Sequence, residues 1–587
     1  MKAMSNPFPS HDLFDSSKKN DRIDTIKILD AMEAELNRSM AGMRISGSPR
    51  PYFMLFSLLR SEVLGIRSAY GSLAKSRAST NSSIFVDIRV GNHRFDNIVD
   101  GGLSMQAEER ESADWIDAPD DLDPEALRIA FWKLTQLRFD EALQDYFDHR
   151  KAMVAEYLRD EQESFSREQP CIHIEQLHDV AFPRKQWEEI LVLLSKRFFD
   201  YPDIYDPSMS ITMERRHRWL TNSEGSRVIT EDVYVEARVE AWVLNEEGVY
   251  LDATRSLSIR DLKALPSFDQ MEQMTEEVIQ ELQALRNAKS PGSFVGPALF
   301  SGQAASTMFH EALGHRLEGE RLVARGETRT FAHKLGEQIL PKGINIYDDP
   351  TMTDSDGRPL WGSYKVDDEG VPAQRAHLVR DGILCGFLCS RSPTIKSTRS
   401  NGHGRHDSTQ RPMARMGNFI VEAEPKASQS WDKLCENLIT LTRKQGKKHG
   451  LVIQRIQSGE TSTSSYDFQV FKGQLAEVYL VDVESRAWQR IQDVELIGTP
   501  LSALQRIVGF GGSPGTDYGF CYAESGSIPV GGIAPAVLLS EVELQQKSTS
   551  GFHEPLIPPH YADDGSRGRV PDFRKRGRRR RSIDDTP

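Results

Sequence analysis

Cysteine is scarce in this chain of 587 residues, and its five cysteines are scattered and odd in number. Such usage excludes the dense disulfide framework of small secreted domains and fits a reducing compartment. The sequence also lacks an apolar run long enough to span a bilayer, and residues 1–20 lack the apolar segment of a secretory signal. We therefore predict a cytoplasmic protein that does not enter a membrane.

An excess of positive charge is missing as well. Lys and Arg number 73 against 86 Asp and Glu, which gives a formal net charge of -13. A general nucleic-acid binder would present a basic face, so the charge argues against that class. The exception is Arg574–Arg581, with seven basic residues in eight. It could mark nucleic-acid or membrane contact, but its Pro-, Ser- and Arg-rich surroundings favour a disordered, solvated tail.

The remaining composition, 38% apolar and 27% charged, is typical of a soluble globular protein. The length exceeds one ordinary core, so several domains are expected. Ser290-Pro291-Gly292-Ser293 is the strongest candidate boundary. We predict a disordered N-terminus over residues 1–20, an N-terminal α/β domain over 21–292, a β-rich C-terminal domain over 293–545 and a basic disordered tail over 546–587.

The periodicity of apolar residues predicts an α+β fold, with helices on an antiparallel sheet in the N-terminal domain. Helical patterns occur at residues 21–43, 126–164, 183–198 and 270–287. Strand patterns occur at residues 52–70, 83–90 and, in an alternating meander with two turn signals, 209–259. The acidic stretch 108–123 is predicted to be a solvated loop. After the domain boundary and one further helix, the pattern changes to short strands separated by glycines.

That further helix contains three side chains that could bind a metal or transfer a proton, His310, Glu311 and His315, within six residues. Neutral imidazole is a preferred zinc donor, and a carboxylate beside the ion can activate a bound water. A strand over residues 295–300 and a turn over 301–303 would lead into the helix. The alternative is a surface helix with a capping histidine and a solvated glutamate.

The spacing of the two histidines predicts an irregular helix. Five residues correspond to about 140° in a regular α-helix, so the two rings would not converge. A π-type turn brings positions five apart onto one face, and such bulges are frequent at functional sites. Gly314, directly before the second histidine, is where the helix could distort at little cost.

The motif and several later stretches resemble the TldD/PmbA family of zinc metallopeptidases. The matching stretches follow the family's order across residues 290–545 and comprise 296–300, 310–319, 366–372, 381–388, 400–405, 412–418, 519–521 and 527–531. Family members that are catalytically competent carry the His-Glu-x-x-x-His motif, whereas their partner subunits lack it. The chain therefore resembles the motif-bearing TldD side.

The resemblance implies that His310, His315 and Cys521 bind Zn²⁺ and that Glu311 is the general base that activates the zinc-bound water. A thiolate is a strong zinc ligand, and three protein ligands leave a fourth position open. Without the resemblance, Cys521 would be interpreted as a small buried hydrophobic residue. The same interpretation is our prediction for Cys385 and Cys389.

The resemblance also implies substrate-binding roles for residues in the paired stretches 400–405 and 412–418, namely His403, Arg405, Arg415 and Asn418. The substrate would be a flexible or unfolded peptide held in extended form along strand edges. The expected assembly is a homodimer, or a heterodimer with a paralogue that lacks the motif. The alternative function is a non-catalytic scaffold subunit with a structural metal site. The intact Glu311 favours the enzyme, because a structural site does not need that carboxylate.

Overall fold

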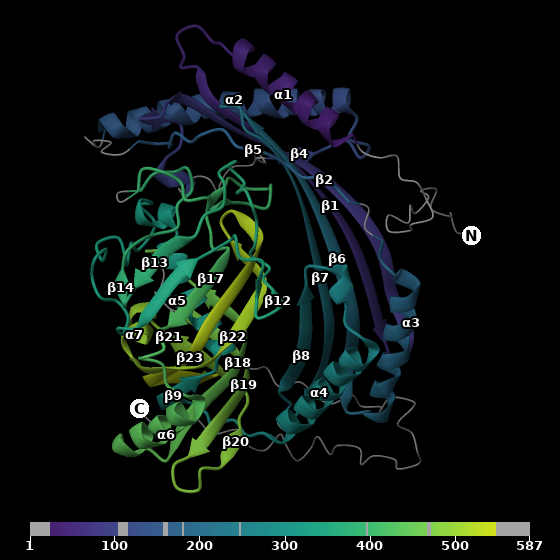
Figure 1. Ribbon diagram of the computed structural model, residues 1–587, viewed down its shortest axis with the longest axis vertical. Coiled ribbons are helices and arrows are strands. Elements are labelled where there is room, and N and C mark those ends of the chain that lie inside the picture. Colours follow the sequence, from purple (N-terminus) through teal and green to yellow (C-terminus); the bar gives the residue numbers. More distant parts are fainter. Residues whose placement is uncertain are drawn as a thin grey trace, which may run out of the picture.

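The computed structural model describes residues 24–103, 115–155, 163–178, 181–245, 248–394, 397–465 and 471–547. The predicted disordered N-terminus, 1–20, and nearly all of the predicted tail, 546–587, lie outside the described residues. Figure 1 shows a long curved sheet with helices on its outer side and a β-rich body on its inner side. Within the described part of the chain, no helix combines the length and the apolar character needed to cross a membrane.

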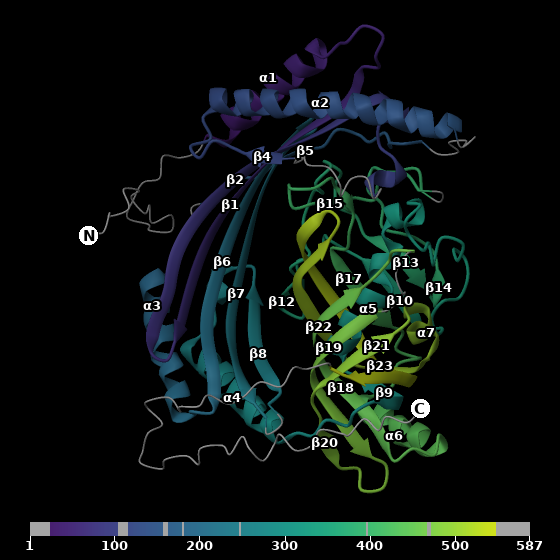
Figure 2. The same cartoon turned by 180° about the vertical axis from the view of Figure 1, so that it is seen from behind.

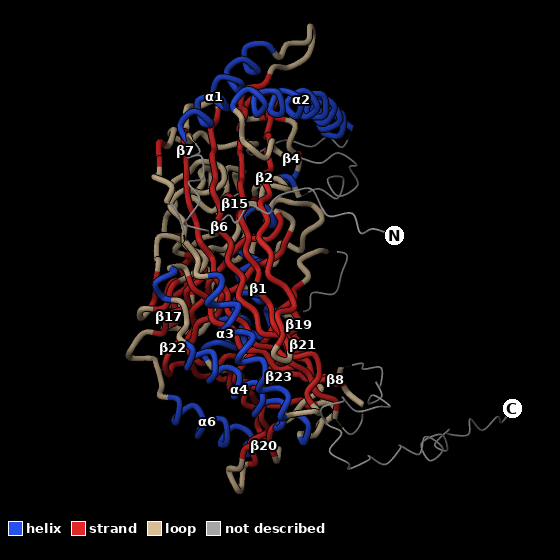
Figure 3. The backbone as a smooth tube through the Cα atoms, turned by 90° about the vertical axis from the view of Figure 1, so that its right-hand side faces the viewer, coloured by secondary structure: helices blue, strands red, loops and turns tan. Residues whose placement is uncertain are grey.

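The N-terminal sheet is antiparallel apart from one short edge strand, β5, which runs parallel to β7. Its order is β3-β2-β1-β6-β7-β5, with β4 paired to β2 and β8 paired to β7. The strands are β1 (Pro51–Ala69), β2 (Ser72–Asn92), β3 (Phe95–Asp96), β4 (Trp115–Asp117), β5 (Ile172–Ile174), β6 (Ile204–Asn222), β7 (Arg227–Leu244) and β8 (Tyr250–Ile259). Figure 3 shows the four longest running along the molecule.

Two pairs of helices cover the outer face of this sheet: α1 (Thr25–Gly42) with α2 (Pro124–Ala155), and α3 (Arg184–Ser195) with α4 (Phe268–Asn287). Met54, Phe56 and Leu58 of β1 pack with α1 and α2, and Leu64 and Ile66 pack with α3 and α4. These positions differ by even numbers and therefore share one face of the strand. The intervening residues near the start of β1 face the C-terminal body.

The C-terminal body contains an eleven-stranded mixed sheet of order β14-β13-β10-β17-β23-β21-β19-β18-β9. Its strands are β9 (Phe294–Phe300), β10 (Ile344–Asp348), β13 (Ala376–Arg380), β14 (Ile383–Leu384), β17 (Asn418–Ala423), β18 (His449–Thr461), β19 (Phe471–Asp482), β20 (Trp488–Arg490), β21 (Val494–Gly498), β22 (Ile507–Ala523) and β23 (Gly526–Gln546). Two short hairpins, β11 (Asp354–Ser355) with β12 (Arg358–Pro359) and β15 (Gly404–Arg405) with β16 (Met413–Ala414), lie outside it.

Three helices belong to this body: α5 (Gly302–Ala312), α6 (Trp431–Lys444) and α7 (Pro500–Gln505). Apolar residues of α5 share the largest core cluster with the sheet, and Leu434 and Leu438 of α6 pack against residues of β9, β18 and β23 in another cluster. Figure 2 shows α5 among the strands and α6 at the lower edge of the body. The α+β fold class is therefore confirmed.

Several local predictions need correction. The second strand begins at Ser72 and not near residue 83, because Tyr70 and Gly71 form a tight turn that pairs it with β1 along its whole length. The second helix is described as far as Ala155, and residues 163 and 164, which fall inside the predicted helix, are not helical. The acidic stretch 108–123 contains β4, although residues 104–114 lie outside the described part. The amphipathic helix α6 was not predicted.

Candidate metal centre

The first residues of helix α5 lie very close to the backbone of strand β22. Ser301 accepts from the backbone N–H of Ala304 and so caps the helix. Gly302 follows, where a Cβ atom would lie 2.1 Å from the backbone nitrogen of Gly515 in β22. Only glycine allows this contact, which sets the helix that carries His310 against the strand that carries Cys521.

The helix ends between the two histidines. It stops at Ala312, Leu313 has φ −125° and ψ −50°, and the 3-10 helix η5 (Gly314–Leu317) then carries His315. The predicted irregularity is present, but the predicted π-type turn is wrong, because the chain tightens instead of widening. Gly314 is required for packing, since a Cβ there would lie 2.2 Å from the sulfur of Met416.

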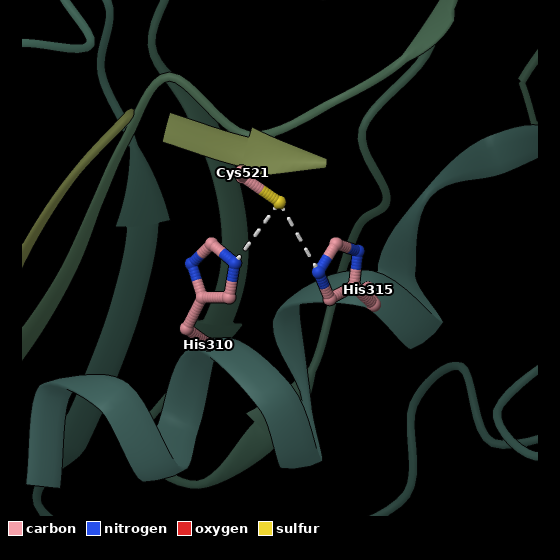
Figure 4. A group of neighbouring side chains, drawn as sticks. All are labelled: His310, His315 and Cys521. Carbon is pink, nitrogen blue, oxygen red and sulfur yellow. Dashed lines mark hydrogen bonds between the residues drawn. The ribbon is translucent and has the colours of Figure 1, made fainter. Parts of the chain in front are cut away.

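This break brings two imidazole rings and one thiol together (Figure 4). Cys521 Sγ lies 3.4 Å from His310 Nε2 and 3.4 Å from His315 Nε2, and the three ligand atoms all lie within 4.8 Å of one another. In the part of the chain that the structure describes, this is the single cluster of His, Cys, Asp or Glu side chains suited to hold a metal ion. Donors bound to one tetrahedral zinc ion are about 3.3–3.8 Å apart, and the two distances from the sulfur to the imidazole nitrogens fall in this range.

The surroundings favour the ligand form of Cys521. Burial alone would raise the pKa of its thiol, but His315, Arg415 and His310 outweigh burial and hold that pKa well below its usual value. The thiolate is the form that binds a metal. His315 and Cys521 are buried and His310 is half-buried, so the cluster reaches solvent on the His310 side.

Glu311 follows His310 on α5 and is 8% exposed. Its side chain lies against the backbone of β18, where a Cβ at Gly459 would come within 2.4 Å of Glu311 Cγ. Burial raises the pKa of the Glu311 carboxyl, although His310 and His315 counteract part of the rise.

A fully buried carboxylate orients His315. Its Nδ1 lies 3.0 Å from Glu318 Oε1, and the other oxygen of Glu318 accepts from Arg321 Nε at 2.8 Å. Burial would raise the pKa of Glu318, but His315 and Arg321 lower it to about 2. A proton on Nδ1 shared with this carboxylate leaves Nε2 as the ligand atom, as in metal sites whose histidines contact a carboxylate. The sequence interpretation assigned Glu318 no role, although it stands three residues after His315, the spacing of one helical turn.

Arg415 holds the thiolate from the other side. Its Nη2 donates to the Cys521 carbonyl at 2.8 Å and to the sulfur at 3.2 Å, and its Nη1 donates to Ser525 Oγ and Gly526 O. The predicted role of Arg415 was substrate binding. Since the side chain is fully buried, its position is that of a support for Cys521.

The other predicted substrate-binding residues lie away from the three ligands. His403 and Asn418 are fully buried; His403 contacts Asp348, and Asn418 accepts from Gly362 N and donates to two backbone carbonyls. Neither side chain lies at a surface that a substrate could contact. Arg405 lines a cavity between the N-terminal sheet and the C-terminal body.

Residues 293–546 match the PmbA/TldA metallopeptidase C-terminal domain. The chain is 27% identical to a metalloprotease of Methanothermobacter thermautotrophicus over 56% of this chain and 66% of that protein. It is 30% identical to a metalloprotease TldD homolog of Haemophilus influenzae over 46% of this chain and 51% of that protein. The matched parts thus span between half and two thirds of the length of these relatives.

The fold is also similar to the crystal structure of TldE from Thermococcus kodakarensis, with a TM-score of 0.56 and 17% sequence identity. This likeness covers 88% of this chain and 100% of that one, and so includes the N-terminal sheet. At such low identity it shows a shared fold. The motif, the domain match and the named relatives support the TldD/PmbA metallopeptidase family for residues 293–546, and the rest of the chain shares the fold.

Proposed function

We propose that this protein is a zinc-dependent metallopeptidase that hydrolyses flexible peptides. The observation that carries the proposal is the cluster of His310, His315 and Cys521 ligand atoms within 4.8 Å, with Glu311 adjacent to the first ligand. Two imidazoles and a thiolate are a zinc donor set, and three protein ligands are typical of catalytic rather than structural zinc. Zinc bound there would supply a Lewis acid that polarises the scissile carbonyl.

The chain's own residues supply the remaining chemistry. Glu311 acts as the general base and takes the proton from the attacking water. Its burial supports this role, because a carboxylate with a raised pKa is a stronger base. Glu318 and Arg415 act as positioning residues that hold His315 and Cys521.

The exposure of the cluster supports a flexible substrate. Only His310 among the three ligands is half-buried, whereas His315 on η5 and Cys521 on β22 are buried. A folded protein could not bring an internal peptide bond to such a position, whereas an extended peptide could enter and lie along a strand.

A dimer is part of the proposal and rests on the family resemblance alone. The partner would be a second copy or a paralogue without the motif, and enclosure between two subunits would further exclude folded substrates. Light scattering on purified protein is the measurement. A stable monomer with full activity would contradict the dimer and leave the peptidase proposal intact.

Glu311→Gln is the test of the mechanism. The amide keeps the shape of the side chain but cannot accept the proton, so kcat for peptide cleavage should fall by about 10²–10⁴-fold. Zinc content, measured by atomic absorption, and the melting temperature should match those of the parent. If the variant cleaved peptides at close to the parental rate, Glu311 would not be the base, and the scaffold function with a structural metal would gain support.

A further inference from the structure

The N-terminal sheet and the C-terminal body enclose a cavity of about 680 Å³ that is separate from the metal ligands. One wall comes from β6, β7 and the end of β8, and includes Arg216, Arg218 and Arg260. The opposite wall comes from the C-terminal body and includes Arg405 and Pro529. Pro529 pairs with Phe520, so this wall belongs to the hairpin that carries Cys521.

Most charges in this cavity already have partners. Arg216 donates through Nε and Nη2 to both oxygens of Glu214, Arg260 pairs with Asp232, and Lys365 pairs with Glu175. Arg218 forms an ion pair with Asp368. The pairs Lys365–Glu175 and Arg218–Asp368 join the two walls, and the four pairs together neutralise four of the five cationic side chains that line the cavity.

Arg405 is the exception. Among the described residues it forms no ion pair, although it is only 6% exposed. Its Nη1 donates to the carbonyls of Met416 and Pro529, and its guanidinium lies 4.6 Å from the centre of the Tyr364 ring. No residue that the structure describes accepts a hydrogen bond from Nε or Nη2. These two donors form one edge of the planar fork that binds a carboxylate with two parallel hydrogen bonds.

The electrostatic surroundings favour an anion with one charge. Burial, with the nearby charges of Arg216 and Arg405, lowers the pKa of Arg218 to about 10, so positive charge is crowded at this place. Glu175, Asp232 and Asp368 already balance other cations of the same cavity, so the described residues offer no second unpaired guanidinium or ammonium group for a doubly charged phosphate. A single carboxylate matches the one guanidinium that lacks a carboxylate partner.

We propose that this cavity is a binding site for a carboxylate group of a peptide, with the Nε and Nη2 donors of Arg405 as its bidentate anchor. That the ligand is a peptide rests on the proposed function, whereas the carboxylate assignment rests on the cavity itself. The carboxylate comes from the end of the peptide chain or from an acidic side chain, and the experiment separates these two sources.

The test is calorimetric binding of three peptides to full-length, zinc-loaded Glu311→Gln protein, which does not turn them over. The probes are N-acetylated tetra-alanine with a free carboxylate, the same peptide as its amide, and an amide in which the last residue is Asp. The free acid should bind at least about 10-fold more tightly than the tetra-alanine amide, the size expected for hydrogen bonds to a charged group. If the Asp amide binds like the acid, side-chain carboxylates also enter; if it binds like the plain amide, the site is specific for the chain end.

Two further variants in the Glu311→Gln background locate the anchor. Arg405→Lys keeps the charge but loses the fork, and the ratio of acid to amide affinity should fall towards one. Arg216→Lys is the matched control, because the same two nitrogens of Arg216 are already held by Glu214, and the ratio should stay at its parental value. A melting curve checks that both variants fold; if Arg405→Lys does not, the peptide comparison in the unaltered cavity decides alone.

Equal affinity for the acid and both amides, or no measurable binding of any of the three, would overturn the site. So would tighter binding of inorganic phosphate than of the free acid, or acid selectivity that survives Arg405→Lys. These outcomes are distinct from failure of the proposed function. Preference for the acid without any peptide cleavage by the parent would refute the peptidase alone, and cleavage without acid preference would refute the carboxylate site alone.

Discussion

Two buried clusters of the C-terminal body differ in how their side chains are used. Asp367, Asp368 and Glu369 are three adjacent acids, whereas the ligand atoms of His310, His315 and Cys521 come from positions up to 211 residues apart. By composition alone, the acidic run is as plausible a cation site as the histidine motif. The structure brings only the second set of ligand atoms together.

The three acidic side chains instead form hydrogen bonds and an ion pair within the folded chain. Asp367 accepts from the backbone N–H groups of Glu369, Val371 and Gly404, and Asp368 accepts from His406 N and pairs with Arg218. Glu369 accepts from Arg391 N. Their oxygens point to separate backbone donors, because successive side chains of a turn diverge. A metal centre is therefore recognised by ligand atoms that come close together in space and not by the number of potential ligands in a short stretch of sequence.

The largest effect should come from removing a ligand. His310→Ala should lose metal and peptidase activity together, and Cys521→Ser should weaken zinc retention strongly, because an oxygen donor suits zinc less well than a thiolate. Zinc per chain after dialysis is the measurement. Glu369→Gln is the control from the acidic run and should retain parental zinc. Full metal content in Cys521→Ser would remove that residue from the site.

The position of the base can be disturbed without touching a ligand. Gly459→Ala places a methyl group within 2.4 Å of Glu311 Cγ, so Glu311 must move, and kcat should fall about 10²-fold, the lower end of a general base contribution. Gly473 pairs with Gly459 across β18 and β19, and a Cβ there meets no atom closer than 3.5 Å. Gly473→Ala should therefore keep activity. Equal kinetics of the two variants would mean that the location of Glu311 is unimportant.

Loss of the carboxylate that orients His315 should have a smaller effect. Glu318→Gln should lower zinc affinity about 10–100-fold, the range found when the partner of a metal-bound histidine is removed. Competition with a chromogenic chelator measures it. Glu327 also pairs with Arg321, which is not one of the three metal ligands, so Glu327→Gln should leave zinc affinity unchanged. A similar loss in both variants would point to a general structural effect of Arg321.

The acidic run should affect stability and its pH dependence. Burial raises the pKa of Asp367 from 3.8 to about 6 and raises that of Glu369 well above 4.5. A carboxyl group whose pKa is higher in the folded protein than in the unfolded protein stabilises the folded state while the group is protonated. The contribution of Asp367 is complete below about pH 4, the unfolded value, and is lost as the pH rises through about 6, whereas that of Glu369 is lost as the pH rises through its own raised pKa.

Glu369→Gln removes one of these titrations and keeps an oxygen that can accept from Arg391 N. Between pH 4 and 7 the free energy of unfolding should fall less in the variant than in the parent. Urea denaturation at a series of pH values measures this difference. Parallel pH profiles of the two proteins would show that the pKa of Glu369 is the same in the folded and the unfolded protein.

Structural features that depend on residues close together in the chain could be predicted from the sequence alone. Alternating residues of 209–259 predicted the strands β6, β7 and β8, and a 3.6-residue period predicted α1 and α4, because one face of each element is buried. The motif of His310, Glu311 and His315 could also be identified from the sequence, because its three side chains lie within six consecutive residues. Helix α6 could also have been found from Ser430 as its cap and Leu434 and Leu438 on one face.

Only the tertiary structure decided which distant atoms meet. The pairing of β22 with β23 and the glycine contact at the start of α5 place Cys521 beside the two histidines. No local sequence pattern distinguishes Cys521 from Cys389 or Cys385. Cys389 is buried as we expected, but Cys385 is exposed, so its predicted place in the core is wrong. After Leu313 the chain continues as a 3-10 helix, and Met416, from the loop between β16 and β17, lies against Gly314. Arg415 and Glu318 acquire their roles in the same way, since burial and distance are properties of the packed chain.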